Sequence, residues 1–86
     1  MDYNEDLVKH IKRFEHELNK AGLPDEAGRK LGSLIGCLEY QVEEGDWPDQ
    51  VVVQLQSAIR AWLESEPQGM NLIPKLDDCI RAITER

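Results

Sequence analysis

Three glycines, Gly28, Gly32 and Gly36, occupy every fourth position within the segment from Pro24 to Glu44. On an α-helix this spacing places them along one side, where each glycine lets another backbone come close. Apolar residues repeat beside them at steps of three and four, the pattern of a core-facing helix: Ala27, Leu31, Leu34, Ile35, Leu38 and Val42. Each glycine costs roughly 1 kcal/mol of helix propensity relative to alanine. Close packing at these three positions is therefore expected to offset the loss.

The sequence leaves open which backbone approaches the glycines. We expect the first or the last helix of the same chain to cross there. The alternative is a docking groove for another protein or for a second copy of this chain, because Gly28, Gly32 and Gly36 flank the apolar stripe and do not coincide with it. Either arrangement predicts that a leucine at Gly32 impairs folding or assembly.

Glycine and proline divide the rest of the chain into further helical segments. Gly22-Leu23-Pro24, Gly45 to Pro48 and Glu66 to Gly69 each break the periodic pattern, and each is a signal for a helix end or a loop. Apolar positions between the breaks recur at helical spacing, and Asn71 is suited to cap the last helix. We predict an all-α fold, a small up-down bundle of four helices in one domain spanning 1–86, with the helices at about 3–21, 24–44, 48–65 and 72–85.

The charge of the chain limits its partners. With 17 acidic and 10 basic residues among 86, the formal net charge is -7. That charge opposes binding to nucleic acid and to anionic membranes, and it favours a basic protein partner. No apolar run approaches the roughly 18 residues of a membrane span, so we expect a cytoplasmic protein without membrane contact.

Few residues have the spacing of a chemical site. His10 and His16 lie on different sides of one helix, so we expect neither to bind a metal. Helical projection places Cys37 opposite the apolar stripe of its segment and Cys79 within the stripe of the last one, so reduced thiols are expected. We find no phosphate-binding loop, nucleophile elbow or metal motif. We therefore expect no enzymatic activity and no cofactor.

An acidic segment with interleaved aromatic residues is the best candidate for a binding site. It has no basic residue, and its members are Glu39, Tyr40, Glu43, Glu44, Asp46, Trp47 and Asp49. Negative charge with aromatic anchors suits a basic protein surface. The alternative is that the acids are only solvated and that Trp47 covers the core.

Two functions remain open from the sequence. The first is a small acidic protein-protein interaction module that binds and inhibits or regulates a basic partner, as immunity proteins, antitoxins or phage antagonists do. The second is a self-associating structural or secretion-chaperone-type subunit, possible as a homodimer because an 86-residue chain builds only a limited core. Binding that weakens with salt would favour the first function.

Overall fold

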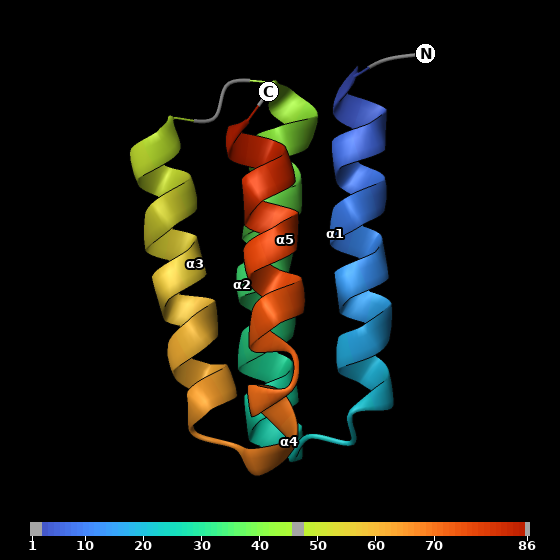
Figure 1. Cartoon of the computed structure of the whole chain (residues 1–86), viewed down its shortest axis with the longest axis vertical. Coiled ribbons are helices and arrows are strands. Elements are labelled where there is room, and N and C mark those ends of the chain that lie inside the picture. The colour runs from blue at the N-terminus through green and yellow to red at the C-terminus, as the bar shows by residue number, and fades with distance from the viewer. Residues whose placement is uncertain (1–2, 46–47, 86) are drawn as a thin grey trace.

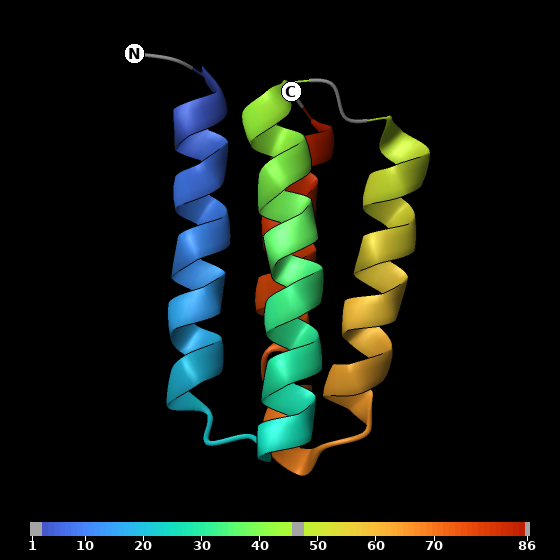
Figure 2. The same ribbon diagram turned by 180° about the vertical axis from the view of Figure 1, so that it is seen from behind.

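The computed structural model describes residues 3–45 and 48–85, which form a bundle of antiparallel helices (Figures 1 and 2). The helices are α1 (Tyr3–Lys20), α2 (Asp25–Glu44), α3 (Asp49–Glu64), the one-turn α4 (Pro67–Met70) and α5 (Ile73–Thr84). The four long helices alternate in direction, so the start of α1, the end of α2, the start of α3 and the end of α5 lie at one end of the bundle. The predicted all-α fold class is confirmed, and the long helices lie within one or two residues of their predicted bounds.

The long helices surround one apolar core in ring order. α1 packs against α2 and α5, and α3 packs against the same two helices. Leu7, Ile11, Phe14 and Leu18 form the buried seam of α1, as their alternating spacing predicts. Among the described residues the core contains no buried polar or charged side chain. Burial of apolar surface is therefore the main force that holds the bundle together.

Two glycines end helices by adopting the left-handed conformation that other residues rarely take. Gly22 follows α1 with a φ of 69°, and Gly45 follows α2 with a φ of 79°. The Gly45 amide donates to the carbonyl oxygen of Val42 at 3.1 Å, which satisfies one of the free carbonyls at the helix end. Pro24 then precedes α2, so the connection between α1 and α2 is short, as predicted.

The segment after α3 differs from the prediction of a loop. It contains α4, whose Gly69 amide donates to the carbonyl oxygen of Glu66 at 2.9 Å. Asn71 follows this turn and does not cap α5, so that part of the prediction is wrong; Leu72 precedes α5 without a side-chain cap. The buried Gly69 lies against the end of α3, and this contact favours the compact turn.

The predicted close packing of Gly28, Gly32 and Gly36 within the chain is wrong. A Cβ atom added at any of the three would meet no atom within 4 Å beyond its own helix and neighbours. The physical reason is their angular position: the buried stripe of α2 faces the core, and the glycines turn away from it toward the edge and the solvent. The alternative, an approach by another chain, stays a prediction, since these positions meet open space within the described chain.

Candidate functional site

The acidic segment predicted as a binding site occupies the end of α2 and the start of α3. α2 stops at Glu44 because Gly45 turns the chain, and α3 starts at Asp49 after Pro48. Asp46 and Trp47 lie outside the described residues. Of the other five predicted site residues, Glu39 is partly buried, and four are exposed: Tyr40, Glu43, Glu44 and Asp49.

Glu39 belongs to the contact between α1 and α2. Its Oε1 atom lies 2.8 Å from Nζ of Lys12, and its side chain is only 20% exposed. The hydrogen bond and the charge of Glu39 raise the pKa of Lys12 above its ordinary value. Glu39 thus forms an ion pair within the bundle, although no basic residue lies near it in the sequence.

Tyr40, by contrast, points into solvent. Its residue surface is 60% exposed, and it is one of three large hydrophobic residues so exposed in the described chain, with Val53 and Met70. Glu43, one turn further along α2, is also exposed. Tyr40 is therefore available for contact with another molecule, and aromatic residues often dominate the energetics of protein interfaces.

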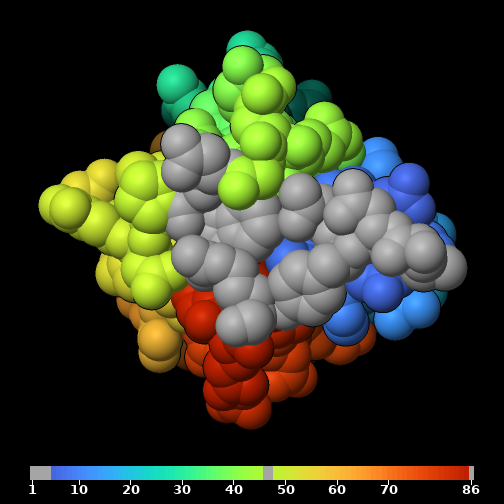
Figure 3. Space-filling view, turned by 90° about the horizontal axis from the view of Figure 1, so that it is seen from above, coloured from blue at the N-terminus to red at the C-terminus, as the bar shows by residue number. Residues whose placement is uncertain are grey.

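The fold adds acids from other helices to those at the end of α2. The start of α1 and the end of α5 lie at this same end of the bundle, which Figure 3 shows face on. We call this surface the acidic end, and its exposed members are Glu5, Asp6, Glu43, Glu44, Asp49 and Glu85. The described residues at 3–6, 43–45, 48–50 and 83–85 include no lysine or arginine. Four helix ends thus contribute charge of one sign.

Glu5, Asp6 and Glu85 were absent from the predicted site, although the sequence contains the signal for them. In an up-down bundle the first residues of one helix and the last residues of the next lie at the same end. Applying that rule to the predicted helices would have placed Glu5, Glu44, Asp49 and Glu85 together. A search for acids that are neighbours in the sequence could not find this group.

Helix dipoles act differently on the members of the acidic end. Glu5, Asp6 and Asp49 lie in first turns, where negative charge is favourable. Glu43 and Glu44 lie in the last turn of α2, where negative charge is unfavourable and no basic residue is present. A cationic partner would relieve this local repulsion at the end of α2.

The opposite end of the bundle has mixed charge. Lys20 lies in the last turn of α1, and α2 begins with Asp25 and Glu26, followed within two turns by Arg29 and Lys30. Among residues 3–45 and 48–85, negative charge is therefore least compensated at the acidic end.

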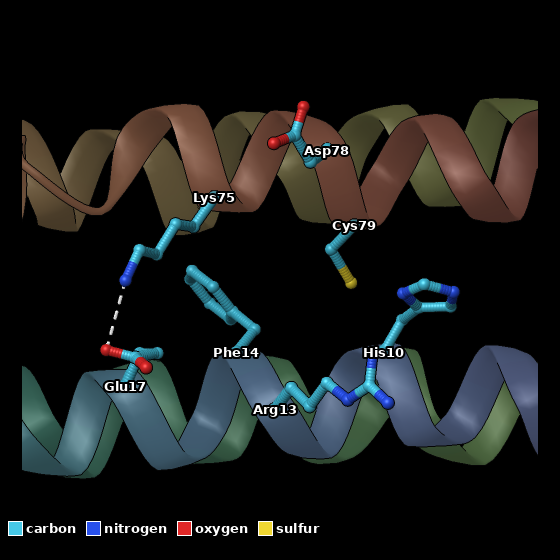
Figure 4. A pocket seen from close by; sticks show the side chains of 7 residues that line it. All are labelled: His10, Arg13, Phe14, Glu17, Lys75, Asp78 and Cys79. Carbon is cyan, nitrogen blue, oxygen red and sulfur yellow. Dashed lines mark ion pairs between the residues drawn. The ribbon is translucent and has the colours of Figure 1, made fainter.

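A shallow hollow between α1 and α5 is the other candidate (Figure 4). Phe14 and Cys79 form its floor, and the sulfur of Cys79 points across toward α1. Burial raises the pKa of the Cys79 thiol to about 11, so it stays protonated and is a poor nucleophile at neutral pH. Lys75 on the rim is paired with Glu17 at 3.1 Å. The side chains of this hollow therefore join α1 to α5 by apolar packing and by one ion pair.

The remaining predicted candidates occupy separate places. His10 and His16 are both exposed, and the described residues contain no group of three potential metal ligands. Both cysteines are free thiols. Cys37 is exposed and Cys79 is buried, which confirms the sides of their helices predicted by helical projection. None of the helices in the described ranges has both the length and the hydropathy needed to cross a bilayer.

Comparisons with known proteins give no further information on function. No protein-family model matches the chain, and neither a curated protein nor a solved structure gives a significant match.

Proposed function

We propose that this protein is an interaction module whose acidic end binds a basic surface of a partner protein and thereby inhibits or regulates it. The observation that carries the proposal is the convergence of six exposed carboxylates from four helix ends with no described base among them: Glu5, Asp6, Glu43, Glu44, Asp49 and Glu85. Such a surface attracts a cationic partner from a distance and accelerates association.

The rigidity of the bundle supports this role. The acids sit on turns at the ends of helices whose inner faces are fully buried, as Val42 and Ile83 are. Because the helices that carry these carboxylates are already folded, binding does not have to order their backbone, which favours affinity. A nucleic acid or an anionic lipid would be repelled by the same surface.

Capture from the source cell tests the proposal with two variants of equal charge. In the first, Asp6→Asn, Glu44→Gln and Glu85→Gln neutralise three members of the acidic end. In the matched control, Asp25→Asn, Glu26→Gln and Glu66→Gln remove the same charge from the opposite end. Circular dichroism confirms that both variants stay folded.

The expected result is a basic protein retained by the wild type and by the control, and lost or strongly weakened with the first variant. Its association rate with the wild type should fall as salt rises, and its activity should fall when the wild type is added. Equal retention by all three proteins, or retention that is independent of salt, would contradict the proposal.

A further inference from the structure

The outer face of α2 has no partner within the described chain. Opposite its buried stripe, α2 presents Arg29, Gly32, Gly36, Tyr40 and Glu43 along one side. Figure 2 looks onto this face, and no other segment of the described chain crosses it. Tyr40 extends from it with 60% of its surface exposed.

Beside Tyr40 the face is hollowed where side chains are missing. Added Cβ atoms at Gly32 and Gly36 would lie in open space. Gly32 also borders a hollow of about 250 Å³ between α1 and α2, with Leu18 and Leu23 among its apolar lining. The helix propensity lost at these glycines, roughly 1 kcal/mol each, is not offset by any contact within the chain.

The positions of the charged residues on this face of α2 are complementary to those on the same face of a second copy of the chain. Arg29 lies seven residues before Gly36 and Glu43 seven residues after it, while Gly32 and Tyr40 lie four residues before and after. A two-fold axis at Gly36 that relates two antiparallel copies of α2 therefore brings Arg29 of each copy to Glu43 of the other. The same axis brings each Tyr40 to the other copy's Gly32. Arg29 takes part in none of the ion pairs among the described residues.

We propose that two copies of this chain associate through this face of α2, with Gly36 at the two-fold axis, Tyr40 seated on Gly32 and Arg29 paired with Glu43. The glycines permit the close approach of the two helices, and the ring of Tyr40 fills the space that their missing side chains leave. Seven residues of helix span about 10 Å, so the paired segment fits within one α2.

The dimer is separate from the proposed binding of a basic partner. Its axis crosses the middle of α2, so the acidic ends of the two copies lie at opposite ends of the assembly. Glu43 belongs to both surfaces, but Glu5, Asp6, Glu44, Asp49 and Glu85 remain outside the paired face. Self-association is measured on the isolated chain, so its failure says nothing about the basic partner.

Sedimentation equilibrium of the full chain tests the proposal directly. The wild type should show a reversible monomer-dimer equilibrium, and Gly36→Leu should weaken it by at least roughly tenfold. The open space at Gly36 means that the leucine does not disturb the monomer, which circular dichroism checks. Gln54→Leu, which adds the same side chain at an exposed position of α3, is the control and should dimerise like the wild type. A monomeric wild type, or a Gly36→Leu variant that dimerises equally well, overturns the proposal.

A charge-exchange experiment tests the register. Arg29→Glu alone and Glu43→Arg alone should each be monomeric, because each places like charges opposite one another at both pairs. Mixing the two variants should produce a heterodimer, because unlike charges then meet at both pairs. Absence of the heterodimer in the mixture, when the wild type dimerises, overturns the antiparallel pairing of Arg29 with Glu43.

Discussion

Gly69 lies directly against the backbone of Leu63. A Cβ atom on Gly69 would lie 2.6 Å from the carbonyl oxygen of Leu63 and 2.9 Å from its Cα atom. Both atoms belong to the end of α3 and cannot move away like a flexible side chain. The φ of Gly69 is not positive, so the position requires glycine for space and not for backbone conformation.

Replacing Gly69 with alanine should therefore destabilise the bundle by about 1 to 3 kcal/mol, as overpacking in cores does. Urea unfolding followed by circular dichroism measures the change. Gly28→Ala is the matched control, because the added methyl group meets open space there. It should raise stability by up to about 1 kcal/mol through helix propensity. Equal effects of the two substitutions would contradict the assigned contact.

The contrast between Gly69 and the glycines of α2 shows which contacts cannot be predicted from the sequence. Periodicity predicts on which side of α2 Gly32 lies, but it does not say where the neighbouring helices lie. Gly69 is preceded by Pro67 and Gln68, which locally indicate a loop, and only the packing of α4 on the end of α3 reveals its contact. Local patterns therefore predicted the four long helices and missed the close packing of Gly69.

The candidate site shows the same limit for charges. The acids from Glu39 to Asp49 were recognisable as a run, but Glu39 turned out to pair with Lys12 across two helices. Glu5 and Glu85 joined the others through the up-down topology. Sequence-local reasoning identified the sign of the charge, and the tertiary arrangement decided which residues share a surface.

A substitution on the buried face of α2 should test the assignment of the apolar core. Ile35 is fully buried in the apolar core, so Ile35→Ala should cost about 2 to 5 kcal/mol through lost burial and the cavity left behind. Val53→Ala is the control on the exposed side of α3, with an expected change within about 0.5 kcal/mol. Thermal unfolding of both variants gives the comparison, and a small effect at Ile35 would contradict the assigned core.

The ion pair between Glu17 and Lys75 should make the contact between α1 and α5 sensitive to acid. The hydrogen bond and the charge of Lys75 lower the pKa of Glu17 below its ordinary value of 4.5. Because the folded-state pKa is depressed, the stabilisation is present above about pH 4.5 and is lost as the pH falls through the folded-state pKa. Glu17→Gln should therefore lower the unfolding temperature at neutral pH and have no effect in stronger acid.

Glu15→Gln provides the control for this experiment, since Glu15 lies on the same helix and makes none of the ion pairs in the described chain. Its effect on the unfolding temperature should change less between neutral and acid pH. A Glu17→Gln deficit that persists unchanged in strong acid would show that the carboxylate acts through something other than its charge.

The buried thiol of Cys79 should make the bundle sensitive to alkali. Burial raises its pKa from 9.0 to about 11, so between these values the unfolded chain releases a proton that the folded chain retains. The free energy of unfolding therefore falls as the pH rises through this window, by about 2 to 3 kcal/mol in total. Cys79→Val removes the titrating group with little change in volume, so its stability should fall less over the same range. Cys37→Ser, at the exposed thiol, should fall as steeply as the wild type. Parallel curves for Cys79→Val and the wild type would mean that another group causes the loss.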